Sequence, residues 1–176
     1  VVPLPFINVE ADTETVTNKL AVTVTIPEKA ESYYSTDLNT WTKFEGTLYL
    51  EQNGLYYFKA VGDTDLESNY VSLNVENIDT IAPTLEITGN ATEWTNKDVV
   101  LTATVSDGTV TFYNGTTWVE GAKQTVSTNG TYIFRVTDAA GNVTEKNVNV
   151  DKIDKVATEL TITGNAEFWT NEDVVL

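Results

Sequence analysis

A long internal repeat constrains the fold of this chain more than any other feature of its sequence. Residues 87–101 return almost unchanged as residues 162–176, so that Trp94 recurs 75 positions later as Trp169. A match of this length and quality does not arise by chance. The period exceeds the roughly 20–50 residues of a solenoid unit. The sequence therefore predicts small domains joined end to end.

The first part of the chain is a more diverged copy of the same unit. Residues 53–60, Asn-Gly-Leu-Tyr-Tyr-Phe-Lys-Ala, parallel residues 129–136, Asn-Gly-Thr-Tyr-Ile-Phe-Arg-Val. We therefore expect a first repeat over residues 1–79, a second over residues 80–154 and the opening of a third over residues 155–176.

The third copy stops within its second expected strand. A two-stranded hairpin is marginal in water, and this one would expose Trp169 and Leu176. We therefore expect the natural protein to continue beyond Leu176 with the rest of a third repeat. We also expect the fragment to be held in place by packing or by a neighbouring copy of the chain.

Each repeat has the sequence pattern of β-structure throughout. Residues 101–105 and 132–136 alternate inward and outward side chains with the period of two that is typical of strands. Asx-Gly turns separate the expected strands at a spacing that suits a sandwich of short antiparallel strands. We predict an all-β chain of tandem immunoglobulin-like β-sandwich domains joined by short linkers. The side chains expected on one inward face are Leu101, Ala103, Val105, Tyr132, Phe134 and Val136.

A recurring aromatic motif supports the immunoglobulin-like prediction. Immunoglobulin domains carry a tyrosine at the corner where their sixth strand begins, two residues before a core cysteine. Here Asn-Gly-x-Tyr-x-Phe occurs twice, with Tyr56 before Phe58 and Tyr132 before Phe134. We expect each tyrosine hydroxyl to bond back to the chain. Each phenylalanine would fill the core volume that a disulfide occupies in immunoglobulins, since this chain has no cysteine.

Several motifs carry a resemblance to a known group of domains. They are residues 78–87, residues 94–101 and residues 129–142, the last ending in Asp-Ala-Ala-Gly-Asn, and residues 34–41 match a Tyr-Ser-x-Asp…Trp hairpin. In these motifs the chain resembles the bacterial immunoglobulin-like repeat domains of secreted and cell-surface proteins, especially those of Gram-positive bacteria. The first repeat departs from the pattern, because residues 62–65 read Gly-Asp-Thr-Asp in place of the Asp-Ala-Ala-Gly-Asn turn.

The resemblance implies a structural role outside the cell. Domains of this group serve as stalks, spacers or adhesive modules of long extracellular chains, secreted or attached to the cell wall. The partners it implies are adjacent repeats of the same chain, and a surface glycan or a host or cell-surface protein. The alternative left open is a carbohydrate-binding accessory module of a secreted glycoside hydrolase. A neighbouring catalytic domain in the full gene would favour this alternative, and many further repeats would favour the stalk.

Composition excludes several other functions. The chain has no histidine, cysteine or methionine, which removes disulfides, thiolate and imidazole metal sites and histidine-based catalysis. Its net charge is −16 and Arg135 is its only arginine, so the clustered positive charge that nucleic acid requires is missing. No apolar stretch reaches the roughly 20 residues that cross a bilayer. The remaining carboxylates are spread over turns and linkers, not paired in a cleft, so we expect no enzymatic activity and no cofactor.

Calcium is the metal that an acidic chain of this kind leaves as a candidate. The carboxylates nearest the linkers are Asp79 and Asp154, and Asp138 lies in a turn able to face a linker. Calcium takes six to eight oxygen ligands, and the sequence lacks dense aspartate clusters, while Lys152 and Lys155 flank Asp154. The competing interpretation, which we favour, is that these aspartates cap turns and keep the surface soluble.

Carbohydrate is the second candidate ligand. Trp41 and Trp118 occupy equivalent positions beside polar turns, and each is followed by an acidic residue, Glu45 or Glu120. An aromatic face beside polar groups suits a sugar ring. Because the tryptophan recurs in both repeats, the competing interpretation is that it anchors a hairpin of the sandwich, and we favour this structural role.

Overall fold

The computed structural model of the chain describes residues 4–164 and 168–175. These residues form fourteen strands and no helix, which confirms the all-β prediction, and none of them belongs to a helical segment able to cross a membrane. The first repeat contains β1 (Asn8–Glu10), β2 (Leu20–Thr25), β3 (Glu31–Ser35), β4 (Thr42–Phe44), β5 (Leu48–Leu50), β6 (Gly54–Val61) and β7 (Val71–Val75). The second contains β8 (Leu85–Thr88), β9 (Val99–Val105), β10 (Thr109–Tyr113), β11 (Trp118–Glu120), β12 (Lys123–Val126), β13 (Gly130–Thr137) and β14 (Val143–Val150).

Each repeat is a sandwich of a three-stranded and a four-stranded sheet. In the first repeat the strand orders are β1-β2-β5 and β4-β3-β6-β7, and in the second they are β8-β9-β12 and β11-β10-β13-β14. Every pair of named strands is antiparallel. The same order of strands within and between the two sheets defines an immunoglobulin-like sandwich in both repeats.

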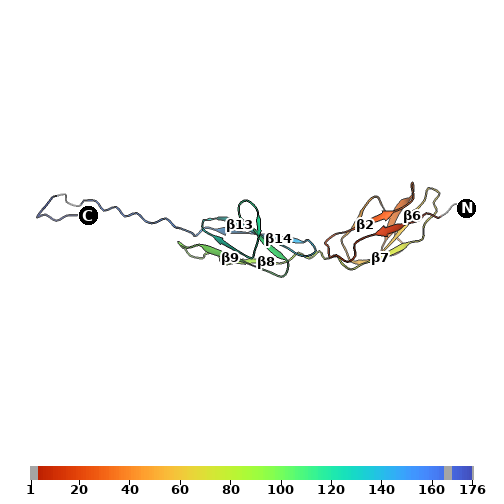
Figure 1. The fold of residues 1–176 in the computed structure, drawn as a ribbon, viewed down its shortest axis with the longest axis horizontal. Helices are drawn as coiled ribbons and strands as arrows, with labels where there is room; N and C mark the ends of the chain where they lie inside the picture. Colours follow the sequence, from red (N-terminus) through yellow and green to blue (C-terminus); the bar gives the residue numbers. More distant parts are fainter. Residues whose placement is uncertain (1–3, 165–167, 176) are drawn as a thin grey trace.

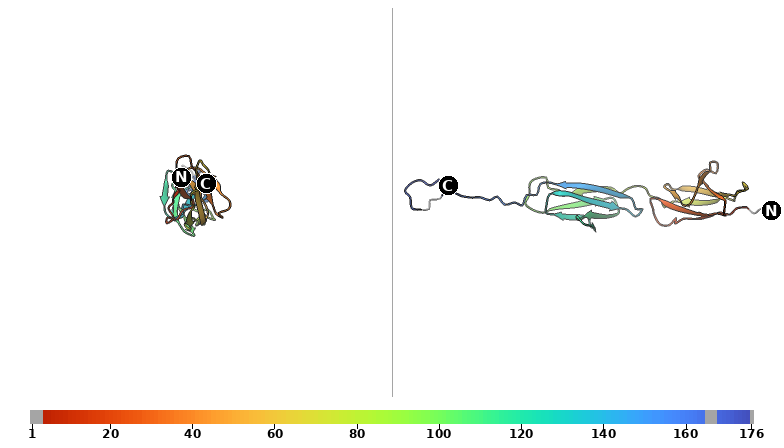
Figure 2. Two further views of the ribbon diagram at one scale, coloured as in Figure 1. Left: turned by 90° about the vertical axis from the view of Figure 1, so that its right-hand side faces the viewer. Right: turned by 90° about the horizontal axis from the view of Figure 1, so that it is seen from above.

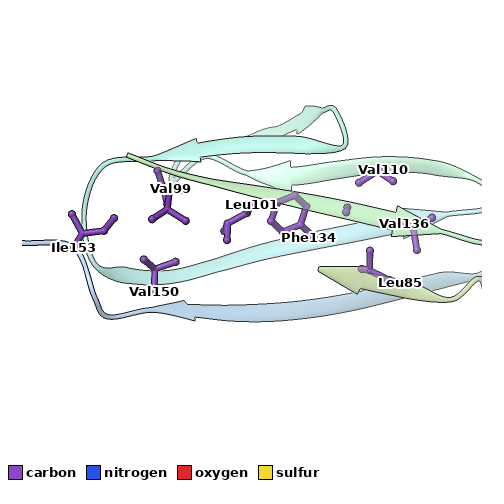
Figure 3. Packing of buried hydrophobic residues seen from close by; sticks show 10 residues of the cluster. Leu85, Val99, Leu101, Val110, Phe134, Val136, Val150 and Ile153 are labelled. Carbon is purple, nitrogen blue, oxygen red and sulfur yellow. The ribbon is translucent and has the colours of Figure 1, made fainter. Parts of the chain in front are cut away.

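The two repeats have separate hydrophobic cores with matching centres. Phe58 and Phe134 are both completely buried, as expected from the repeated motif, and each lies next to a second aromatic ring, Phe44 or Phe112. In Figure 3, Phe134 lies between the two sheets, flanked by aliphatic side chains from both. The second core consists of Leu85, Val99, Leu101, Ala103, Val110, Val126, Phe134, Val136, Val150 and Ile153.

The predicted tyrosine corners are present in both repeats. The hydroxyl of Tyr56 donates to the carbonyl oxygen of Gln52 at 2.8 Å, and that of Tyr132 donates to the carbonyl oxygen of Thr128 at 2.7 Å. Each bond spans four residues and fixes the turn that leads into β6 or β13. The recurring Asn-Gly-x-Tyr-x-Phe motif therefore predicted both the corner and the buried ring correctly.

The two sandwiches follow one another along one long axis. Figure 1 shows β1–β7 and β8–β14 as successive units, and the end-on view in Figure 2 shows that their outlines overlap. Residues 154–164 run on from the second sandwich as an extended trace. The described residues of the segment after Ile153, 154–164 and 168–175, form no strand and are exposed, and Trp169 is fully exposed. The described residues of this segment do not pack against the second repeat, so the expectation of packing is wrong, whereas the alternative of a neighbouring copy stays a prediction.

Candidate functional site: the junction between the repeats

The distal end of the first repeat is closed by a short parallel bridge. Thr17 pairs with Ile78. The amide of Thr17 donates to the carbonyl oxygen of Asn77 at 3.0 Å, and the carbonyl oxygen of Thr17 accepts from the amide of Asp79 at 3.0 Å. The bridge joins the segment that precedes β2 to the segment that follows β7. It thus fixes the point at which the chain leaves the first repeat.

An asparagine side chain holds the same departing segment from the other side. The carboxamide of Asn53 donates to the carbonyl oxygen of Ile78 and accepts from the amide of Ile78, both at 2.8 Å. Ile78 itself is buried against the core. Since both backbone groups of Ile78 and its side chain are engaged, the linker starts from a fixed position.

The turn between β13 and β14 forms the facing surface on the second repeat. The carboxylate of Asp138 accepts from the backbone amide of Asn142 at 2.8 Å and from its side-chain amide at 2.9 Å. The amide of Gly141 also donates to the carbonyl oxygen of Asp138 at 3.2 Å. These bonds shape a tight turn that directs the carbonyl group of Ala140 toward the first repeat.

The peptide units on either side of Asp79 connect the two repeats. The amide of Asp79 donates to Thr17 of the first repeat, and the carbonyl oxygen of Asp79 accepts from the side-chain amide of Asn142 at 2.9 Å. A direct bond between the sandwiches lies beside this connection, because the amide of Asn18 donates to the carbonyl oxygen of Ala140 at 2.9 Å. The linker is therefore bonded on both sides.

Gly141 is required by the shape of this junction. Its φ angle is +88°, which lies in the left-handed region that residues other than glycine rarely adopt. A β-carbon at this position would lie 3.7 Å from the side-chain nitrogen of Asn18, so the clearance to the first repeat is at ordinary contact distance. The backbone conformation, more than the space, is what selects glycine here.

Asp138 is the junction carboxylate with a shifted pKa. Its side chain is nearly buried, and this burial raises the pKa, but the hydrogen bonds from Asn142, Gly141 and Ala140 outweigh it and hold the pKa below its usual value. Asp138 is therefore ionised at neutral pH and acts as an acceptor for the turn.

The three aspartates predicted as calcium ligands lie in two different places. Asp79 and Asp138 meet at the junction, where both are linked to the side chain of Asn142, whereas Asp154 lies at the far end of the second repeat. One carboxylate oxygen of Asp79 accepts from the amide of Ile81 and one of Asp154 accepts from the amide of Val156, both at 2.9 Å. Within residues 4–164 and 168–175, no three acidic side chains gather as a metal site would require.

The two predicted sugar-binding tryptophans share one local arrangement. The side-chain nitrogen of Lys59 lies 4.5 Å from the centre of the Trp41 ring, and the guanidinium carbon of Arg135 lies 3.9 Å from that of Trp118. Each cation also pairs with a glutamate, Glu67 or Glu145. A cation therefore covers one face of each indole in both repeats.

A polar hollow lies close to the first of these tryptophans but does not include it. The hollow opens beside the hairpin of β3 and β4, and its lining includes Tyr34, Asp37 and Tyr49, whereas Trp41 is not part of it. The indole ring of Trp41 is therefore not in one depression with these polar groups. Sugar binding at Trp41 and Trp118 stays a prediction.

Sequence reasoning misses the asparagines that hold the two linkers. The turn motifs indicate only turns at Asn53, Asn129 and Asn142, whereas the side chains hold backbone groups of the linker after each repeat. The signal for the first two was their recurrence before Gly-x-Tyr in both repeats. The sequence held no equivalent signal for Asn142, since its turn occurs once.

Comparison with known proteins gives only remote likenesses. No family model matches the chain, and no curated protein matches it. Among solved structures, the fibronectin(III)-like modules of Clostridium thermocellum CbhA are 17% identical, with 89% of this chain and 100% of that chain covered and a TM-score of 0.39. Three N-terminal domains of the Highly Immunogenic Outer Capsid protein (Hoc) of bacteriophage RB49 are 16% identical, with 84% and 58% covered and a TM-score of 0.38. Likenesses of this size identify neither a family nor a function.

Proposed function

We propose that this chain is a non-catalytic structural spacer, a segment of the stalk of an extracellular bacterial surface protein. Its role is to hold successive domains at a fixed distance and orientation. The observation that carries this proposal is the bonding around Asp79. Its amide is bonded to Thr17 of the first repeat and its carbonyl oxygen to Asn142 of the second.

Relative motion is the usual expectation for two domains that share a small, polar interface. Three features oppose that motion here. Ile78 is buried at the start of the linker, and Pro83, whose φ angle is fixed by its ring, is buried at its end. The hydroxyl of Thr144 donates to the carbonyl oxygen of Pro83 at 2.6 Å. Only residues 79–82 therefore remain between two anchored points, and Asn142 bonds within that stretch.

The strong negative charge also suits a spacer. With a net charge of −16, neighbouring copies of the chain repel one another, which keeps densely displayed rods soluble and apart. The effect depends on ionic strength, since charges more than about 8 Å apart are largely screened at physiological salt.

The proposal is tested by the rotational diffusion of the two repeats in solution. Residual dipolar couplings and nitrogen relaxation should fit one elongated body for the whole of residues 4–153. Asn142→Ala removes the bond to Asp79, and we expect the two repeats to require separate alignment tensors while each keeps its fold. The matched control is Asn147→Ala, because Asn147 is an exposed asparagine of β14. Independent tumbling of the repeats in the unaltered chain would contradict the spacer proposal.

The carbohydrate-binding alternative has its own test. Isolated chain would be applied to a glycan array together with Trp41→Ala and Trp118→Ala variants. The spacer proposal expects no specific binding. Saturable binding that either variant abolishes would support the accessory-module alternative.

A further inference from the structure

The distal end of the second repeat is built like that of the first. Thr95 forms a parallel bridge with Ile153. The amide of Thr95 donates to the carbonyl oxygen of Lys152 at 2.9 Å, and the carbonyl oxygen of Thr95 accepts from the amide of Asp154 at 2.8 Å. The side chain of Asn129 donates to the carbonyl oxygen of Ile153 at 2.9 Å and accepts from its amide at 2.8 Å. The parallel bridge and both asparagine bonds of the first repeat therefore have counterparts here.

The two ends differ in what covers them. Asn18 and Asp79 are half-buried beneath the turn of the second repeat, whereas their counterparts Asn96 and Asp154 are exposed. The amide of Asn18 donates to Ala140, but no acceptor among residues 4–164 and 168–175 receives the amide of Asn96. Together with Trp94 and Thr95, Asn96 and Asp154 line a shallow hollow at this end.

The chain leaves both ends in the same way. Residues 154–162 repeat the pattern of residues 79–87, and the carboxylates of Asp79 and Asp154 each accept from the amide two positions later. Thr158 stands where the first linker has Pro83, so the second linker shares the aspartate turn of the first but not its proline. A repeat joined by this linker therefore starts from the second end as the second repeat starts from the first.

We infer that the hollow at Trp94, Thr95, Asn96 and Asp154 is a docking site for the next immunoglobulin-like repeat, and that the docked element is an Asp-Ala-Ala-Gly-Asn turn before its last strand. The carbonyl oxygen of the second alanine of that turn accepts from the amide of Asn96. The asparagine of the turn donates to the carbonyl oxygen of Asp154. This inference rests on the proposed spacer function and extends it to a second junction.

Trp94 makes this second junction different from the first. It stands where the first repeat has Val16, and its side chain is 69% exposed, compared with 45% for Val16. A docked turn would remove part of this indole surface from water, and burial of apolar surface favours association. We therefore expect the indole to add apolar contact at the second junction.

The test uses a chain of three repeats. Residues 88–154 are appended after Ile162, which keeps the natural linker and supplies a third repeat with the required turn. Hydrogen exchange then reports on two amides, Asn18 and Asn96. We expect the exchange of Asn96 to slow by at least about tenfold relative to the 176-residue chain, because a bonded amide exchanges only when the junction opens. The amide of Phe134 in the appended copy reports that this copy is folded.

The matched control carries Asn142→Ala in the appended copy only. We expect the protection of Asn96 to be lost in this variant while that of Asn18 is unchanged. In a Trp94→Val variant, we expect the protection of the Asn96 amide to lie between that of the three-repeat chain and that of the Asn142→Ala control. Protection that persists in the Asn142→Ala control would overturn the assignment of the turn as the docked element.

The outcomes also separate this inference from the spacer proposal. If Asn18 is protected and Asn96 is not, the second docking site does not exist although the first junction does. If neither amide is protected, the junction itself does not form and both proposals fail.

Discussion

The two repeats agree in their cores and differ most in the connection between their last two strands. Between β6 and β7 the first repeat has a long loop, residues 62–70, in which Asp65 adopts a φ angle of +59°. Between β13 and β14 the second repeat has the five-residue turn that docks on its neighbour. The sandwich tolerates either connection because no residue of either connection belongs to the buried core of its repeat. This connection is therefore free to serve assembly, while the core alone determines the fold.

The comparison predicts equal effects where the repeats agree. Phe134→Ala should destabilise the second repeat by about 3–5 kcal/mol, the usual cost of emptying a buried aromatic site. Phe58→Ala should do the same to the first repeat, since both rings are completely buried. Native-state hydrogen exchange, read separately for each repeat, measures the two losses. A loss below about 1 kcal/mol in either repeat would mean that the ring is not at the centre of its core.

A smaller equal effect is expected from the asparagines that hold the linkers. Asn53→Ala and Asn129→Ala each leave the amide and carbonyl groups of a buried isoleucine, Ile78 or Ile153, without their partner. Leaving such groups unpaired costs about 1–3 kcal/mol. Chemical denaturation of the two variants should show losses of similar size. If only one repeat is destabilised, the two ends are not equivalent and the docking inference loses its basis.

Acid should loosen the turn through which the second repeat docks on the first. The pKa of Asp138 is held below its usual value in the folded chain. Its contribution is therefore complete above the unfolded pKa of about 3.9 and is lost as the pH falls through the lower, folded value. As the pH falls below about 4, we expect common tumbling of the repeats to give way to independent tumbling. Asp138→Asn should remove this pH step, and a step that survives the substitution would assign it to another group.

Calcium is expected to have no effect. The carboxylate of Asp138 is already occupied by the two nitrogens of Asn142, and a ligand that binds only the folded state must raise its stability. Excess chelator should therefore leave the melting temperatures of both repeats unchanged. A rise with added calcium that Asp79→Asn abolishes would overturn this prediction and place a cation at the junction.

The core could be predicted from the sequence, whereas the bonds that Asn142 makes at the junction could not. Alternation in residues 132–136 and the repeated Tyr-x-Phe predicted which side chains turn inward, because burial imposes a period of two on a strand. The bonds of Asn142 were out of reach, since its partners in the linker, Asp79 and Ile81, accept through backbone oxygens that every residue possesses. The cations over Trp41 and Trp118 were hidden for a different reason. They come from strands that are distant in sequence and become neighbours only in the folded sheet.

A pull on the two ends of the chain would load the bridge between Thr17 and Ile78 in shear. Thr17 belongs to the segment that arrives from the amino terminus and Ile78 to the segment that departs, and the two run parallel. Tension therefore drags them in opposite directions along the bridge, so that its two hydrogen bonds share the force instead of opening one after the other. The bridge between Thr95 and Ile153 repeats this arrangement. Each sandwich thus resists extension at the point where the chain leaves it.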